Sequence, residues 1–256
     1  MNPIFTQTDM MFRRFQIHKY RAEGMVPTVT MTVIANITHL LELRKIKNSE
    51  GKYSCHITIT HLLTKAVADT LKDYPLLFSF FTGKEIIENQ ELIIGIPVDI
   101  EQHVEYIAIH HPDSKNLSSI AAETTEELNK IHAGNGTFFK AIKALMENTS
   151  NSTHSPMDFC RQYLGNFPIS NFGTFHIDNG TLAIAQPIIS GMCIGSVKSS
   201  EYWQSGQGQE CMLLPITVSF DHRPVDGAYV GKFLDRVRNL LENPEPLFVN
   251  SDPAGD

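Results

Sequence analysis

The sequence predicts one α+β domain built around a single sheet that is mainly antiparallel or mixed. Short alternating segments typical of strands are interspersed with long amphipathic helices along the chain. One pair of apolar segments is joined closely enough for a hairpin, which places antiparallel strands in the sheet. The chain has no internal repeat and no low-complexity tract. Its 256 residues can bury one sizeable core or two small ones.

The first third of the chain is expected to begin with a strand followed by two helices. Residues 28–36 (TVTMTVIAN) alternate with period two, as a half-buried strand does, and Thr38 is placed to cap the next helix, THLLELRKIKN. A more apolar helix is expected from about Thr60 to Asp73, because Pro75 then stops it. The segment SFFTGKEIIEN has a Thr-Gly-Lys turn between two apolar runs and predicts the hairpin.

The rest of the chain again combines predicted strands with predicted helices, and one segment interrupts them. Two strands and a polar-faced helix are predicted at Leu92–Ile100, Val104–His110 and Leu117–Ile131. A flexible insertion is expected over about residues 133–165, where FFKAIKALM predicts a short helix and NTSNSTHSP a polar loop. Strand character then resumes at three places, near Phe167, near Met192 and over Met212–Phe220. A last helix is predicted from about Asp226 to Glu242.

The composition is that of an ordinary globular protein, with 42% apolar and 19% charged residues. A net charge of -7 argues against nucleic-acid binding, which needs clustered lysine and arginine. No apolar run is long enough for a membrane span, and no signal-peptide pattern begins the chain. The four cysteines lack CxxC spacing, which disfavours a zinc site and a disulfide framework. We therefore expect a cytoplasmic protein without a metal, a membrane or a nucleic acid as partner.

The segment SFDHRPVDG carries the strongest functional signal. An apolar strand, LLPITVSF, leads directly to His222, and Asp226 and Gly227 follow in a loop. An imidazole titrates near neutral pH, so it can act as the base that deprotonates a thiol during acyl transfer. On spacing alone, an alternative stays open, in which Asp221, His222 and Asp226 only form a turn and a helix cap.

The same segment resembles the C-terminal signature of the dihydrolipoamide acyltransferases, the core subunits of 2-oxo acid dehydrogenase complexes. Their pattern is DHRxxDG, an amphipathic helix and a Leu-Glu-x-Pro ending, and this chain has DHRPVDGAYVGKFLDRVRNLLENPEPL. The more distant chloramphenicol acetyltransferases carry HHxxxDG, and Asp221 replaces the first of those histidines. Weaker similarities keep the family's order over residues 10–248, in VPTVTMTVIANITHLLELR, LIIGIPVD, NFPISNFG, QPII and CIGSV.

This resemblance implies a fold and a set of site residues. The fold would be a chloramphenicol acetyltransferase-like two-layer sandwich, a mixed sheet with helices on one side, in a single catalytic domain over residues 1–256. His222 would be the general base, and Ser170 the donor to the oxyanion. Asp226 would order the active-site loop through an N-terminal arginine. Structural support is expected from Arg13 or Arg14, from Asn171, and from Gly227, where the backbone would pass closely before the helix.

The sequence departs from the family where the substrate channel is expected. The family strand usually has GLVVPV, whereas this chain has HVEYIAIHH, without the glycine and the proline. We therefore expect a polar channel formed from His103, Glu105, Tyr106 and His110, and a more polar or bulkier acceptor. Because side chains alternate along a strand, either His103 and Glu105 or Val104 and Tyr106 would face the channel. No lipoyl domain and no subunit-binding domain is recognised in the chain.

Three functions remain open from the sequence. The first is an acyltransferase that moves an acyl group between coenzyme A, as co-substrate, and a dihydrolipoyl thiol or another small acceptor. The second is the core of a 2-oxo acid dehydrogenase complex whose lipoyl domain lies elsewhere. The third is a catalytically silent assembly scaffold, which the joint presence of His222, Asp226 and Ser170 disfavours.

The resemblance also implies a homotrimer with each active site at a subunit interface. Larger shells in this family depend on a short apolar C-terminus that enters another trimer. Here the chain continues past Leu247-Phe248-Val249 into the acidic tail NSDPAGD. Burying unpaired carboxylates costs several kcal/mol per ion, so we expect a trimer without a shell, although Leu247 and Phe248 remain possible plug residues.

Overall fold

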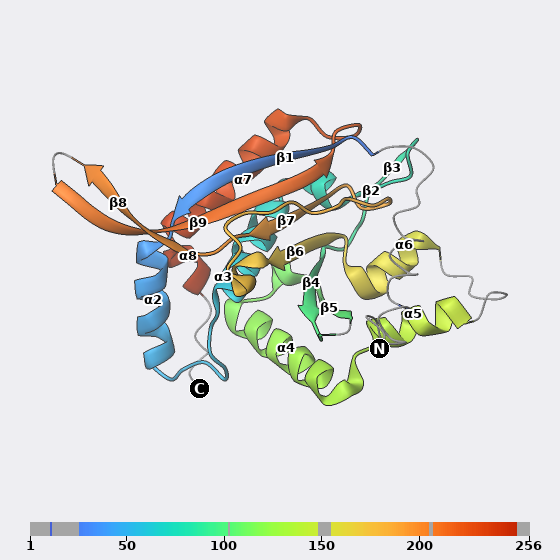
Figure 1. The fold of residues 1–256 in the computed structure, drawn as a ribbon, viewed down its shortest axis with the longest axis horizontal. Coiled ribbons are helices and arrows are strands. Elements are labelled where there is room, and N and C mark those ends of the chain that lie inside the picture. Colours follow the sequence, from blue (N-terminus) through green and yellow to red (C-terminus); the bar gives the residue numbers. More distant parts are fainter. Residues whose placement is uncertain (1–10, 12–25, 102, 148–154, 205–206, 250–256) are drawn as a thin grey trace, which may run out of the picture.

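The computed structural model describes residues 11, 26–101, 103–147, 155–204 and 207–249. They form a mixed sheet with helices packed against it (Figure 1). The strands are β1 (Thr28–Asn36), β2 (Phe80–Phe81), β3 (Ile86–Ile87), β4 (Ile93–Asp99), β5 (Val104–His110), β6 (Phe167–Asn171), β7 (Ser190–Ile194), β8 (Lys198–Gln204) and β9 (Gln207–Asp221). The helices are α2 (Thr38–Ser49), α3 (Ile59–Leu71), α4 (Leu117–Lys130), α5 (Phe138–Glu147), α6 (Pro156–Phe159), α7 (Gly227–Glu242) and α8 (Glu245–Phe248).

The main sheet has the strand order β1-β9-β7-β6-β4-β5, and β8 pairs with β9 beside this path. Strand β6 runs parallel to both of its neighbours, whereas the other pairs are antiparallel. Strands β2 and β3 form a separate hairpin. The sheet is therefore mixed, as the sequence predicts, and the α+β fold class is confirmed.

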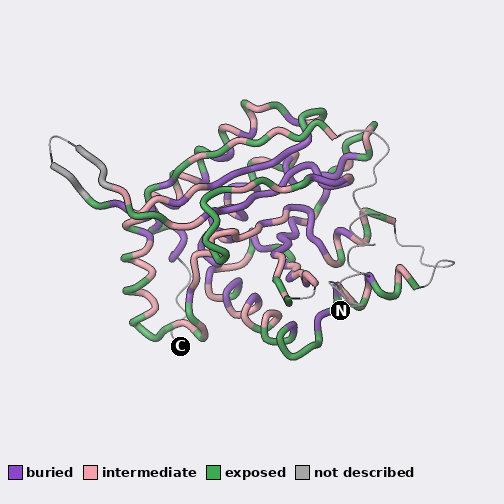
Figure 2. Tube along the Cα trace, in the orientation of Figure 1, coloured by how far each residue is buried: buried purple, intermediate pink, exposed green. Residues whose placement is uncertain are grey.

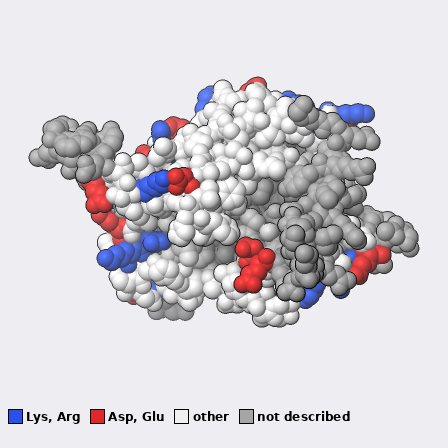
Figure 3. Space-filling model, viewed as in Figure 1, with Lys and Arg blue, Asp and Glu red and all other residues white. Residues whose placement is uncertain are grey.

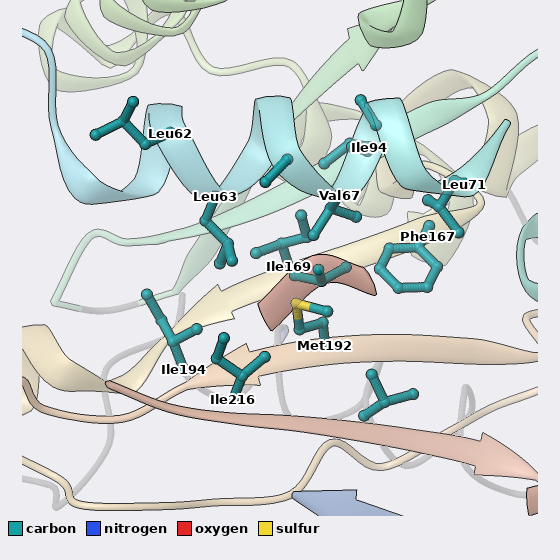
Figure 4. Close-up of a cluster of buried hydrophobic side chains, with 14 of the residues drawn as sticks. Leu62, Leu63, Val67, Leu71, Ile94, Phe167, Ile169, Met192, Ile194 and Ile216 are labelled. Carbon is teal, nitrogen blue, oxygen red and sulfur yellow. The ribbon is translucent and has the colours of Figure 1, made fainter. Parts of the chain in front are cut away.

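The core lies between the sheet and helices α3, α4 and α7. Leu63 and Val67 of α3 point toward the strands, where Ile169 and Met192 lie beneath them (Figure 4). Each buried side chain of this size contributes about 1.5–3 kcal/mol to the hydrophobic stabilisation. Figure 2 shows the same division, with buried residues concentrated along the central strands and exposed ones on the outer helix faces.

Helix α3 begins with a capping box. The Thr58 hydroxyl accepts a hydrogen bond from the His61 backbone N–H, and the His61 ring accepts one from the Thr58 backbone N–H. The His61 side chain is thus buried at the first turn, and its burial lowers its pKa to about 4. Its neighbour His56 lowers the pKa further by charge repulsion. The imidazole at this position is therefore neutral at physiological pH.

Most expected elements occur at their predicted places, including β1, the β2–β3 hairpin, β4, β5, α4, α5 and α7. The expected cap of α2 is wrong. Ile37 occupies the N-cap position, and no side chain caps the helix. The Thr38 hydroxyl instead accepts a hydrogen bond from the Met212 backbone N–H and donates one to the Asn36 side chain. That hydroxyl therefore ties the start of α2 to β9.

The segment expected to be an insertion contains helices α5 and α6 in its described part. They pack around a second apolar cluster that contains Phe138 and Ile142 from α5, and Cys160 and Leu164 after α6. The cluster also receives Phe80 of β2. The expected short helix at FFKAIKALM is thus confirmed. The expected polar loop lies largely in residues 148–154, outside the described residues.

Candidate active site

The C-terminal end of β9 holds the candidate base between two anchored backbone groups. Asp221 is the last residue of the strand, and its N–H donates to the carbonyl oxygen of Ile189 at 2.9 Å. The N–H of His222 donates to the carbonyl oxygen of Pro27, just before β1, at 3.0 Å. Because β9 is paired with β1 on one side and β7 on the other here, the strand end is a rigid platform.

A buried ion pair shapes the loop around His222. The Asp221 carboxylate is 1% exposed and accepts from Nη2 of Arg223 at 2.6 Å and from Nε at 3.0 and 3.2 Å. It also accepts from the backbone N–H of Arg223 at 3.0 Å. The hydrogen bond to Asp221 raises the pKa of the Arg223 guanidinium above its usual range. A buried carboxylate requires such donors, so the pair closes the chain into a tight turn that contains His222.

The His222 side chain itself is exposed, and its ring lies 5.6 Å from that of Phe220. Neither ring nitrogen makes a hydrogen bond within the described part of the chain. The ring is thus accessible to a second molecule or to another copy of the chain. This accessibility is what a base that takes a proton from a bound thiol needs.

Asp226 is the N-cap residue of α7, and it is exposed. Its side chain makes no hydrogen bond to the helix N–H groups, so Asp226 occupies the N-cap position without capping the helix through its carboxylate. Its expected partners, Arg13 and Arg14, lie outside the described residues, and the assignment stays a prediction. A Cβ at Gly227 would meet only the Met31 sulfur at 3.7 Å, an ordinary contact, so no close backbone approach is present there in one chain.

Ser170 lies on β6, and it is half-buried. It pairs with Cys193 of β7, and its hydroxyl makes no hydrogen bond to any described residue. The next residue, Asn171, donates from Nδ2 to the Thr60 hydroxyl on α3 at 3.1 Å. Asn171 therefore fixes the end of β6 to the helix layer, and the roles expected for Asn171 and Ser170 stay predictions.

Ser170 and His222 lie far apart within the sheet. Ser170 pairs with Cys193, which pairs with Thr217 on β9, five positions before His222 (222 − 217). At about 3.3 Å per strand residue, these five positions alone separate the two by roughly 16 Å along the strand. One chain therefore does not bring the candidate base and the candidate oxyanion donor together.

The predicted channel residues of β5 have internal partners. Glu105 is 4% exposed, and its Oε2 accepts from the backbone N–H groups of Phe138 and Phe139 at 3.1 and 3.3 Å. His103 lies 3.3 Å from Glu105 and packs on Phe139, with ring centroids 4.1 Å apart. Gly136 passes so close to Glu105 that a Cβ there would lie 2.4 Å from its carboxyl carbon. Both polar residues therefore hold the start of α5.

The other two predicted channel residues, Tyr106 and His110, make contacts of their own. The Tyr106 ring packs 4.7 Å from the Phe138 ring, also on α5. His110 is exposed at the far end of β5, with Nδ1 2.6 Å from the Glu91 carboxylate. Contacts within the chain thus account for these polar residues, at α5 for His103, Glu105 and Tyr106 and at Glu91 for His110, so their polarity does not by itself indicate a polar acceptor. The channel lining itself stays a prediction.

A model of the family described as 2-oxoacid dehydrogenases acyltransferase (catalytic domain) matches the sequence over residues 13–138 and 136–249. The chain belongs to this family. The resemblance inferred from the DHRxxDG segment is therefore confirmed.

Curated acyltransferases of the family share low but extended identity with the chain. The dihydrolipoyllysine-residue acetyltransferase component of the acetoin cleaving system of Bacillus subtilis (strain 168) is 27% identical over 223 residues, covering 86% of this chain and 51% of that protein. The chain spans about half the length of the curated relatives it matches.

Two solved structures have a fold similar to that of this chain. The cubic core of the pyruvate dehydrogenase multienzyme complex superposes with a TM-score of 0.77 at 23% identity, covering 97% of this chain and 94% of the other. Chloramphenicol acetyltransferase superposes with a TM-score of 0.52 at 10% identity, covering 92% and 95%. The expected chloramphenicol acetyltransferase-like fold is thus confirmed for this acyltransferase-family chain.

Sequence reasoning missed the Asp221–Arg223 pair as a part of the family's loop. The acid and the base stand two residues apart directly after an apolar strand, and this spacing was the available signal.

Among the described residues, no group of three or more His, Cys, Asp and Glu side chains is placed to hold a metal ion. Nor does any described helix have the length and apolarity needed to cross a bilayer.

A surface groove of about 580 Å³ lies at the other end of the β1–β9 pair, lined by residues from β1, α2, β9 and α7: Ile34, Asn36, Thr38, His39, Glu42, Cys211, Leu213 and Glu242. None of the predicted site residues contributes to it. The groove is therefore separate from the loop that carries His222.

Proposed function

We propose that the chain transfers an acyl group between coenzyme A and a dihydrolipoyl thiol or another small acceptor. Family membership supports acyl transfer, and the curated relatives are named dihydrolipoyllysine-residue acetyltransferases. The observation that carries the proposal is the turn of Asp221, His222 and Arg223, which fixes the backbone around an exposed imidazole. This geometry supports a positioned base, because the His222 imidazole is exposed and its backbone is anchored.

In the proposed reaction His222 takes the proton from the attacking thiol. The thiolate adds to the carbonyl carbon of the acyl thioester, and the carbonyl oxygen becomes an oxyanion that the Ser170 hydroxyl stabilises by donating a hydrogen bond. The intermediate collapses when the carbon–sulfur bond of the leaving thiol breaks. His222 returns its proton to that sulfur, so proton and electrons balance without a metal.

The active site would be shared between subunits of a homotrimer. Ser170 and His222 lie far apart within one chain's sheet, so a site that uses both needs two copies of the chain. The exposure of the His222 ring supports the same arrangement, because an interface would cover it. Asp226 would then order the loop through an N-terminal arginine, Arg13 or Arg14.

Assembly beyond the trimer is not expected. Leu247 and Phe248, the residues considered as a C-terminal plug, are 0% and 9% exposed and belong to the main core of their own chain. An exposed Val249 follows them. Because the two larger side chains are already buried, they are not available to enter another trimer.

The protein would act in the cytoplasm on small or protein-borne thiols. Its four cysteines are free, and three are buried. Burial raises the pKa of the Cys193 thiol to about 11, so this thiol stays protonated at neutral pH and does not compete as a nucleophile.

On the face shown in Figure 3, the described lysines and arginines lie scattered among carboxylates, which does not favour nucleic acid as a partner.

The direct test supplies the purified chain with acetyl-coenzyme A and free dihydrolipoamide and follows the release of coenzyme A. A matched reaction without dihydrolipoamide corrects for hydrolysis. Acceptor-dependent release is the expected result. A chain that binds acetyl-coenzyme A but transfers nothing, either to dihydrolipoamide or to an isolated dihydrolipoyl domain, would support the silent scaffold instead.

A further inference from the structure

Two adjacent phenylalanines on β2 each lie beneath an arginine. The guanidinium carbon of Arg223 lies 5.0 Å from the Phe81 ring centroid, and that of Arg161 lies 5.1 Å from the Phe80 centroid. Successive residues of a strand face opposite sides, so the two arginines approach β2 from different directions. Only one of them, Arg223, belongs to the loop that carries His222.

Contacts other than the one with Arg223 hold Phe81 in place. It is 8% exposed, its N–H donates to the Pro187 carbonyl oxygen at 2.7 Å, and it pairs with Ile86 in the hairpin. The hairpin lies beside the C-terminal end of β9 (Figure 1). The Phe81 ring is thus a rigid surface next to the active-site loop.

Arg223 has few other restraints. Its side chain is 35% exposed, and its hydrogen bonds in the described part of the chain all go to Asp221. A planar guanidinium that bonds a carboxylate along its edge can still tilt about that edge. The Phe81 ring opposes this movement, because a cation is attracted to an aromatic face.

We propose that Phe81 is a positioning residue for the acyl-transfer reaction, which holds the Arg223 guanidinium flat against Asp221 and so fixes the backbone that presents His222. The inference rests on the proposed function for its catalytic consequence. The contact itself is independent of that function. Phe81 does not touch the reacting atoms and acts only through Arg223.

Three variants test the inference against a matched control. Phe81→Leu keeps an apolar side chain but removes the ring, Phe81→Tyr keeps the ring, and Phe80→Leu removes the neighbouring ring that faces Arg161. We expect Phe81→Leu to lower kcat by about 10-fold without changing the KM for acetyl-coenzyme A, because a small displacement of a catalytic group lowers the rate and not substrate binding. Phe81→Tyr should restore kcat, and Phe80→Leu should retain it.

Hydrogen–deuterium exchange gives a second readout that needs no catalysis. The backbone amides of residues 221–223, 225 and 226 should exchange faster in Phe81→Leu than in the wild type, and at the wild-type rate in Phe80→Leu. Equal exchange in both leucine variants, or an unchanged kcat in folded Phe81→Leu, overturns the inference. A wild type that transfers no acyl group defeats the proposed function, while the exchange comparison still decides whether Phe81 orders the loop.

If Phe81→Leu does not fold, Phe81→Met replaces it, since methionine fills the apolar position without an aromatic ring. A loss of kcat in Phe81→Met, together with full activity in Phe81→Tyr, supports the inference. Wild-type activity in folded Phe81→Met contradicts it.

Discussion

Glu105 accepts a hydrogen bond from the backbone N–H of Phe138, 3.1 Å away, at the first turn of α5. The positive end of the helix dipole lies at that turn, so a negative charge there is stabilising. Glu105, which was expected to face a substrate, thus links strand β5 to helix α5.

Replacing this carboxylate should destabilise the fold. Glu105→Ala leaves two backbone N–H groups buried without an acceptor, and we expect it to lower the free energy of unfolding by about 1–3 kcal/mol. Glu105→Gln keeps one acceptor and should lose less. Urea unfolding measures both. Exposed Glu147→Ala at the end of α5 serves as the control, and a Glu105→Ala midpoint equal to that control would show that the contact contributes nothing.

His222→Ala should lower acyl transfer by a factor of about 10²–10⁴, the usual contribution of a positioned acid–base group. The fold should remain intact, because the ring makes no hydrogen bond within the described part of the chain. Steady-state kinetics with acetyl-coenzyme A and dihydrolipoamide provide the measurement, and circular dichroism checks the fold. Comparable activity in the variant would remove His222 from the mechanism.

Ser170→Ala should lower kcat by about 10²–10³ if its hydroxyl stabilises the oxyanion, with unchanged affinity for coenzyme A. A loss confined to binding would instead make Ser170 a substrate-positioning residue.

Mixed trimers of the Ser170 and His222 variants provide a further test of the shared site. Co-expression of Ser170→Ala with His222→Ala should restore activity that neither variant has alone, because some interfaces then combine an intact serine with an intact histidine. A site built within one subunit predicts no such rescue.

The stability of the protein should depend on His61 in acid. Below pH 6.5 the unfolded chain binds a proton at this residue, whereas the folded chain resists protonation until the pH approaches about 4. The unfolded state thus binds more protons in this window, and the free energy of unfolding falls as the pH is lowered through it, by on the order of 3 kcal/mol.

His61→Gln should flatten this dependence, because glutamine keeps an acceptor for the capping box but does not titrate. Thermal unfolding between pH 4 and about 7 provides the comparison, and exposed His132→Gln is the control. If His61→Gln and the wild type lose stability in parallel, other groups are responsible.

Light scattering should return a particle of three times 28.7 kDa. Leu247 and Phe248 are buried in their own chain, so neither of them is available as a plug for a larger shell. A particle of many trimers at ordinary concentrations would contradict this expectation.

The regular elements could be predicted because their signals are local. The alternation of β1 and the helical spacing of α4 and α7 are contained within each segment. Strand β8 was missed because Lys198–Gln204 is polar and has no clear alternation. Thr38 was wrongly expected to cap α2 because its actual partner, Met212, is distant in the sequence.

The site was predictable in part for the same reason. The DHRxxDG spacing is local and identifies the loop, including His222. The contact of Glu105 with the start of α5 was not predictable, because its partner Phe138 lies 33 residues further along the chain. The separation of Ser170 from His222 depends on the parallel pairing of β6, which no local pattern encodes.

The position of α5 also affects solubility. Strand β5 is the last strand of the main sheet, and such strands present unpaired backbone groups that recruit other chains. With Glu105 and Tyr106 holding α5 beside it, this edge is partly screened. A change that detaches α5 therefore exposes an aggregation-prone edge, and the variant chain is expected to precipitate while its DHRxxDG loop is still folded.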